Sequence, residues 1–271
     1  MPNALSLHIG LNEVDPAHYE NWNGPLLACE YDANDMKQLA KLQGFTPSQL
    51  LTKAATRKAV TNKILDAAKT LKSGDIFFLT YSGHGGQLPD QNSDEPDGVD
   101  ETWCLYDGQL IDDELFYAFG RFAAGVRILI LSDSCHSGSV IKANNMARRT
   151  FDPERRPRVM PLEIVQRTYL AHRKFYDDLA SDPKLKDAED KVNATALLVS
   201  GCQDSQYSMD GPFNGAFTAM LKNVWNGGKF KGDYRKFHKV IVSGMPSEQV
   251  PNYYLIGTAN KAFESQKPFT V

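Results

Sequence analysis

The chain has 271 residues, of which 42% are hydrophobic and 23% charged, and its formal net charge is −3. This is ordinary globular composition, with enough length for one large domain and a sizeable core. The small net charge gives no reason to expect nucleic acid or an anionic membrane as a partner. The sequence contains no apolar stretch that could span a bilayer and opens on no signal-peptide pattern, so we expect a cytoplasmic protein.

Strand and helix patterns alternate through the first third of the chain. We predict strands at 4–11, 49–51 and 76–81, with helices at 32–44 and 56–71 between them. The strand at 76–81 is apolar without alternation, which is typical of a strand buried on both faces of a parallel sheet. The alternation predicts a parallel sheet with helices on its faces. Because the first strand starts almost at residue 1, we expect no domain ahead of it.

The rest of the chain continues this pattern around two long polar segments. An acidic loop at 90–107 includes the start of a hairpin formed by 102–106 and 109–111, and a helix follows to about 122. A second doubly buried strand is expected at 126–131. The segment 141–193 is polar and basic, with a helix only at 161–179. Further strands are expected at 195–200 and 251–257, with helices at 214–225 and 234–242 between them.

Two buried strands end in turns of small residues, one carrying His84 and the other Cys135. A free cysteine is most often a small buried hydrophobe, so the thiol alone is weak evidence of catalysis. Neighbouring parallel strands would bring both side chains to one sheet edge, where an imidazole activates a thiol as a nucleophile. The backbone N–H groups of Gly85 and Cys135 could then stabilise an oxyanion. The other cysteines, at 29, 104 and 202, form no CxxC pair, which gives no support for a zinc or thioredoxin-type site.

The segments 81–87 (YSGHGGQ) and 133–139 (DSCHSGS) resemble the two catalytic blocks of the metacaspases and their prokaryotic relatives, the orthocaspases. Segments 29–33, 97–102 and 199–204 resemble further blocks of the same family, in the same order. The resemblance implies an α/β caspase-like fold, with a mostly parallel sheet of about six strands, the last antiparallel, and helices on both faces. It also implies a cysteine endopeptidase with Cys135 as nucleophile and His84 as base. His136 is a rival base by position, but the resemblance assigns the role to His84.

The resemblance further implies a specificity pocket formed by Cys29, Asp32, Ser82 and Asp133. Two carboxylates at the base of a pocket pair with the cation of Arg or Lys, so cleavage after these residues is expected, in polypeptides that expose them. Asp32 has an alternative role, because it could simply cap the helix that begins beside it. No cofactor is required on this interpretation, and the family tends to act as monomers.

Calcium is needed by many metacaspases, and the positions that hold it correspond to Asp100, Asp112, Asp113 and Lys142. The three carboxylates suit a hard cation, but a lysine ammonium cannot ligate it. The lysine therefore favours a calcium-independent enzyme of the orthocaspase kind. Asp112 and Asp113 also have the alternative role of starting a helix.

The whole chain, 1–271, is interpreted as one peptidase domain in three parts. Residues 1–140 form a large-subunit-like part with both catalytic residues, 141–193 a mobile basic linker or insertion, and 194–271 a small-subunit-like part. A protease that cuts after Arg or Lys is expected to cut its own exposed basic segment between Arg148 and Arg158. Two alternatives stay open: a catalytically silent caspase-like binding or regulatory protein, and a Cys/His hydrolase that is not a peptidase.

Overall fold

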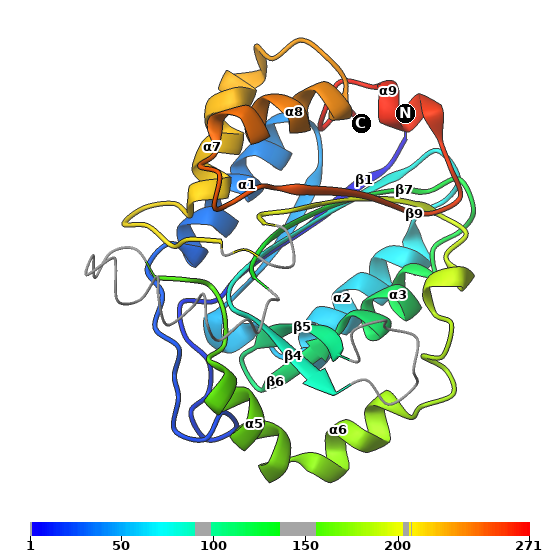
Figure 1. Cartoon of the computed structure of the whole chain (residues 1–271). Coiled ribbons are helices and arrows are strands. Elements are labelled where there is room, and N and C mark those ends of the chain that lie inside the picture. The colour runs from blue at the N-terminus through cyan, green and yellow to red at the C-terminus, as the bar shows by residue number, and fades with distance from the viewer. Residues whose placement is uncertain (1, 90–98, 136–155, 203–205, 207) are drawn as a thin grey trace.

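A six-stranded sheet crosses the middle of the molecule (Figure 1). The computed structural model describes residues 2–89, 99–135, 156–202, 206 and 208–271. The strand order is β2-β1-β3-β7-β8-β9; the first five strands are parallel and β9 is antiparallel to β8. This confirms the predicted six-stranded, mostly parallel sheet. The bounds are β1 (Ala4–Gly10), β2 (Thr46–Leu51), β3 (Ile76–Ser82), β7 (Arg127–Asp133), β8 (Thr195–Ser200) and β9 (Asn252–Gly257).

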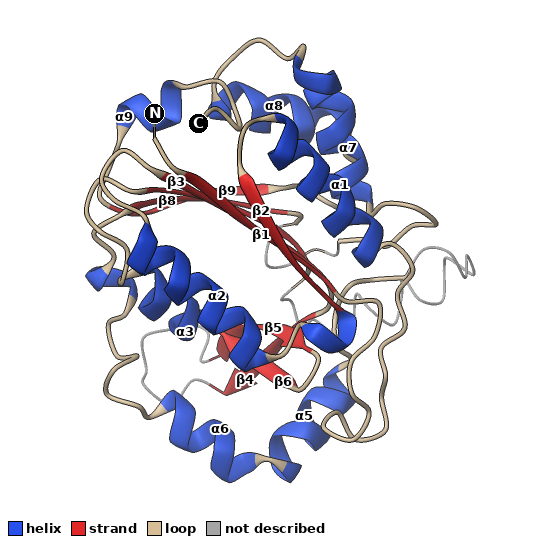
Figure 2. Cartoon of the chain, turned by 180° about the vertical axis from the view of Figure 1, so that it is seen from behind, coloured by secondary structure: helices blue, strands red, loops and turns tan. Residues whose placement is uncertain are grey.

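Helices cover both faces of this sheet (Figure 2). One face carries α1, α7 and α8, and the other carries α2 and α3, so both faces of the central strands are buried. None of the helices in the described ranges has the length and hydropathy needed to cross a membrane. The bounds are α1 (Cys29–Leu42), α2 (Arg57–Thr70), α3 (Asp112–Phe119), α5 (Leu162–Ala171), α6 (Arg173–Ala180), α7 (Ala216–Trp225), α8 (Tyr234–Gly244) and α9 (Lys261–Ser265).

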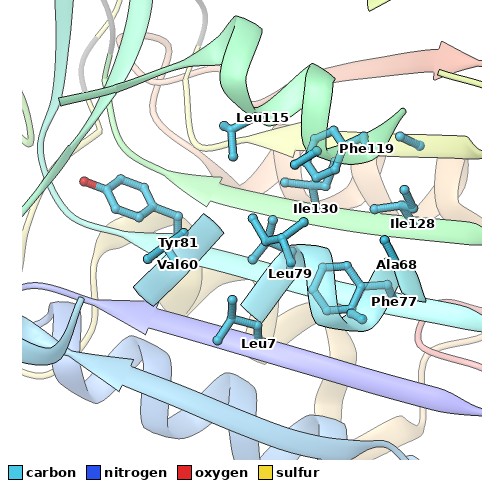
Figure 3. Close-up of a cluster of buried hydrophobic side chains, with 14 of the residues drawn as sticks. Leu7, Val60, Ala68, Phe77, Leu79, Tyr81, Leu115, Phe119, Ile128 and Ile130 are labelled. Atoms are coloured by element: carbon cyan, nitrogen blue, oxygen red, sulfur yellow. The ribbon is translucent and has the colours of Figure 1, made fainter. Parts of the chain in front are cut away.

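The continuous apolar runs of β3 and β7 divide between two cores by simple alternation. Ile128 and Ile130 of β7 pack into the core under α2 and α3, whereas Leu129 and Leu131 pack into the core under α1, α7 and α8. Figure 3 shows the first of these cores, in which Ile130 lies close to Leu79. A strand with apolar residues at every position is stable here because both of its faces are covered.

A small antiparallel sheet of β4 (Gly85–Pro89), β5 (Val99–Leu105) and β6 (Gly108–Ile111) lies beside the α2–α3 layer. The β5–β6 hairpin was predicted, but β4 was not, because its first residues belong to the small-residue turn predicted around His84. Pairing of Gly85 with Trp103 of β5 draws that segment into a strand. The predicted helix at 161–179 is two helices, α5 and α6, which meet at His172. The short helix α9 was not predicted.

Removal of a side chain from the first core tests how much the central sheet depends on it. Leu79→Ala, at a fully buried position of β3, should lower the free energy of unfolding by about 2–5 kcal/mol, because lost burial and the cavity left behind add together. Chemical denaturation measures this change. Leu170→Ala, on the exposed side of α5, is the control and should change stability by less than about 0.5 kcal/mol. Equal losses in the two variants would contradict the proposed role of the core.

Candidate active site

The carboxyl ends of β3 and β7 place His84 and Cys135 at the same edge of the sheet. The two strands pair in parallel register, with Ser82 opposite Asp133. His84 and Cys135 each follow two residues later, so both leave the sheet at the same level. The central strands thus bring together the two residues that the sequence motifs single out.

The imidazole of His84 is held in its neutral form. Its Nε2 lies 3.0 Å from the carbonyl oxygen of Gly24, which can only accept a hydrogen bond, so Nε2 carries the proton. Nδ1 therefore keeps its lone pair, and this buried atom has no hydrogen-bond partner among the described residues. Burial lowers the pKa of His84 to about 4, so the ring is uncharged at neutral pH. Trp22 packs against it, with ring centroids 4.8 Å apart.

Cys135 is fully buried, and its thiol lies beside the backbone of Ser208. Sγ is 3.4 Å from the Ser208 carbonyl oxygen and also accepts a hydrogen bond from the Ser208 N–H. The segment after β8 therefore forms one wall of the cysteine site. Cys202, in the same segment, packs against Cys135. Its sulfur donates to the carbonyl oxygen of Ser134 at 3.5 Å.

Two backbone N–H groups converge on one carbonyl oxygen, that of Arg158. The distances are 3.0 Å from Gly85 N and 3.1 Å from Cys135 N. These are the two donors that the sequence indicates for an oxyanion hole. Both predicted donors therefore point at the same oxygen, that of the Arg158 carbonyl.

The chain around Arg158 lies extended through this cleft, as a bound peptide would. Arg158 N donates to the Ser208 carbonyl oxygen at 2.9 Å, and Asp210 N donates to the Arg156 carbonyl oxygen at 2.8 Å. On the other side of the Arg158–Val159 bond, Met160 N donates to the Gly85 carbonyl oxygen at 2.8 Å. The protein's own segment therefore occupies both sides of the cleft.

The guanidinium of Arg158 is fully buried in an acidic pocket. Nη2 lies 2.7 Å from Asp32 Oδ2 and 2.9 Å from Asp210 Oδ1. Nη1 lies 2.9 Å from Asp133 Oδ2 and donates to Ser82 Oγ, also at 2.9 Å. Both ends of the planar fork thus meet acceptors, which suits arginine geometry. Burial raises the pKa of Asp32, and the charge of Arg158 acts in the opposite direction.

The structure thus brings the four predicted pocket residues together. Cys29 is buried beside this cluster, and burial raises the pKa of its thiol. Asp32 does not cap α1, whose N-cap residue is Ala28; its carboxylate points into the pocket instead. The expectation that the basic segment is exposed is wrong for Arg158, because the acidic pocket buries it completely.

Sequence reasoning missed two residues of the pocket. Asp210 contributes a third carboxylate, which also accepts from the N–H groups of Leu27 and Ala28 at 2.7 and 3.2 Å. Gly215 lets the chain pass close to the guanidinium: a Cβ atom there would lie 2.6 Å from Cζ of Arg158. Neither residue stands in one of the quoted motifs; the only available signal is that both follow the 199–204 block.

The predicted calcium positions lie on the small sheet and the helix after it. Asp100 is in β5, and Asp112 and Asp113 open α3, which confirms their helix-starting role. No three His, Cys, Asp or Glu side chains of the described residues gather as metal ligands. Lys142 and the rival base His136 lie outside the described residues. The calcium interpretation stays a prediction.

A mostly parallel sheet whose central strands end in a histidine and a cysteine defines a caspase-like α/β protein. The family model of the caspase domain matches residues 14–263, so the chain belongs to the caspase-domain family. Among solved structures, caspase-1 from Spodoptera frugiperda has a TM-score of 0.58 at 12% identity, covering 93% of this chain and 86% of that one. This likeness shows the fold alone.

Closer relatives are found in both sequence and structure. The crystal structure of protein GSU0716 from Geobacter sulfurreducens has a TM-score of 0.91 at 55% identity, covering 100% of this chain and 99% of that one. Metacaspase-1 of Schizosaccharomyces pombe is 36% identical over 151 residues, which is 50% of this chain and 34% of that protein. Metacaspase-1 of Mycosarcoma maydis is 26% identical over 256 residues, covering 82% and 62%. The chain thus spans less than two thirds of the length of these two metacaspases.

Proposed function

We propose that the protein is a cysteine endopeptidase that cuts after arginine, with Cys135 as nucleophile and His84 as base. One observation carries the proposal: the Arg158 carbonyl oxygen accepts from both Gly85 and Cys135 while its side chain fills the acidic pocket. A peptide bond held in this way has its side chain recognised and its carbonyl polarised at the same time.

The catalytic steps follow from the protonation of the dyad. Nδ1 of His84 takes the proton of the Cys135 thiol, and the thiolate attacks the carbonyl carbon that precedes the scissile bond. The N–H groups of Gly85 and Cys135 stabilise the negative oxygen of the tetrahedral intermediate. His84 then gives its proton to the leaving amine, and water hydrolyses the thioester in a second, similar step.

The pocket favours arginine over lysine on geometric grounds. Four acceptors, on Asp32, Asp133, Asp210 and Ser82, surround the two ends of a flat fork. A lysine ammonium is a point charge and cannot reach acceptors placed at both ends at once. An aspartate in this position would meet three carboxylates, so cleavage after aspartate is strongly disfavoured.

Self-processing is part of the same proposal. The bond between Arg158 and Val159 has its carbonyl at the proposed oxyanion hole and lies within the basic segment, which makes it the expected self-cleavage site. Cleavage there divides the chain into 1–158 and 159–271.

Peptide assays test the proposed activity directly. Peptides with a fluorogenic group after Arg should be hydrolysed faster than Lys peptides, and Asp peptides should not be hydrolysed, because of the pocket's charge. Cys135→Ala should abolish turnover, since it removes the sulfur that forms the thioester. Parallel assays with calcium and with a chelator test the calcium prediction. Cleavage after Asp, or activity that survives Cys135→Ala, would overturn the proposed function.

Replacement of the third carboxylate tests the pocket. Asp210→Asn should lower kcat/KM for Arg peptides by about 10- to 100-fold, since a hydrogen bond to a charged partner contributes roughly 1.5–3 kcal/mol. The reduction for Lys peptides should be smaller, because a point charge uses fewer of the acceptors. Asp66→Asn removes a carboxylate from an exposed site on α2 and should leave both values unchanged. An unchanged Arg/Lys ratio in Asp210→Asn would exclude Asp210 from arginine selection.

Mass spectrometry tests the expected self-cleavage site. Purified wild type should yield a fragment whose first residue is Val159. Arg158→Gln should lose this cut, because the amide has no cation for the pocket, and Cys135→Ala should lose every self-cut. Fragment 159–271 from Cys135→Ala would show that another protease makes the cut.

A further inference from the structure

Residues on the leaving side of the Arg158–Val159 bond are also held by contacts with the protein. Met160 is only 2% exposed and packs in a cluster with Val14, Tyr19 and Cys104. Its Sδ lies 3.8 Å from Cys104 Sγ, and its N–H donates to the Gly85 carbonyl oxygen at 2.8 Å. The side chain and the backbone of Met160 are therefore both held.

Helix α5 extends this attachment. It begins at Leu162, two residues after Met160, and its residues Ile164 and Val165 join the same apolar cluster. Gly85 contacts both sides of the Arg158–Val159 bond. Its N–H donates to the Arg158 carbonyl oxygen, and its carbonyl oxygen accepts from the Met160 N–H. Breaking the Arg158–Val159 bond removes none of these contacts, so the new amino group of Val159 stays next to the Arg158 carbonyl carbon.

Water has little room at the scissile bond while this segment is seated. Arg158 and Cys135 are both fully buried, and His84 is 6% exposed. In hydrolysis of a free peptide, the leaving amine departs and a water molecule takes its place. Here the Val159 amine stays held at the place that the hydrolytic water would take. A nucleophile held beside its target reacts as if it were present at a very high concentration.

Building on the proposed function, we propose that the self-cleavage at Arg158–Val159 is reversible, because Met160 anchors the new amino terminus beside the thioester and lets it rejoin. In the reverse direction, the Cys135 sulfur first re-forms the thioester with the Arg158 carboxyl group, which releases water. The nitrogen of Val159 then attacks the Arg158 carbonyl carbon, the C–N bond forms and the C–S bond breaks. His84 takes the proton that the amine loses, and the Cys135 sulfur regains a proton from it. No further reactant is needed. Met160 thereby marks a binding subsite, formed by Val14, Tyr19 and Cys104, for an apolar residue two positions after the cut.

Oxygen-18 water provides the test. Hydrolysis in labelled water puts the heavy isotope into the Arg158 carboxylate, and return through the thioester carries it into the carbonyl of rejoined chain. Digestion with a protease that cuts after glutamate releases residues 155–163, a peptide that exists only where the Arg158–Val159 bond is whole. In wild type this peptide should gain 2 Da with time.

Variants of Met160 separate the anchor from the chemistry. Met160→Asp should lower the labelled fraction of peptide 155–163 by about tenfold or more, since a buried carboxylate does not fit the apolar cluster. Met160→Leu keeps the apolar side chain and should retain the label. Leu170→Asp, on the exposed side of α5, is the matched control and should behave as wild type.

The outcomes distinguish this inference from the proposed function. If wild type makes fragment 159–271 and hydrolyses Arg peptides but its whole chains never acquire label, the cut is irreversible and the inference is wrong. Equal labelling in Met160→Asp and wild type would exclude Met160 as the anchor. If wild type neither cuts itself nor hydrolyses peptides, the proposed function itself fails.

Discussion

The buried guanidinium of Arg158, surrounded by three carboxylates, is the interaction on which the site depends. One cation cannot neutralise Asp32, Asp133 and Asp210 together, and isolated charges in an interior are costly. Further donors therefore satisfy each carboxylate: Asn214 and Gly215 for Asp32, Ser208 and Thr218 for Asp133, and Leu27 and Ala28 for Asp210. The pocket thus connects α1, β7 and the segment between β8 and α7 through charge-assisted contacts.

The geometry of the pocket depends on the register of the central sheet. Parallel pairing of β3 with β7 sets Ser82 opposite Asp133, so two of the residues that contact the Arg158 guanidinium are register partners. His84 and Cys135 follow at the next level. A shift of register by one residue would turn every side chain to the opposite face of the sheet and would separate pocket from dyad. The doubly buried apolar runs of β3 and β7 hold the register, so their hydrophobicity contributes to the geometry of the site as well as to stability.

Local sequence predicted the elements and residues whose signals are local. The buried strands and the hairpin of β5 and β6 follow from short apolar patterns, and the dyad candidates follow from two turns at strand ends. Gly85 was predicted as an oxyanion donor but not as part of β4, because its strand conformation comes from pairing with Trp103, eighteen residues away. Asp210 lies 182 residues from the Ala28 N–H that it accepts from, and no pattern within its own segment reveals that contact.

Arg158 shows most clearly why composition alone misleads. A run of arginines is normally a solvated surface, yet one member of this run is fully buried because distant carboxylates compensate its charge. That compensation also limits access to the cleft. An outside polypeptide must replace the contacts of Arg158 with equivalent ones, in competition with a segment attached to the same molecule. If the chain is cut after Arg158, the residues on each side of the cut can leave the cleft only when their own contacts break. The apolar contacts of Met160 and the charges around Arg158 therefore hold the two sides of this bond separately, and both limit how far the cleft opens.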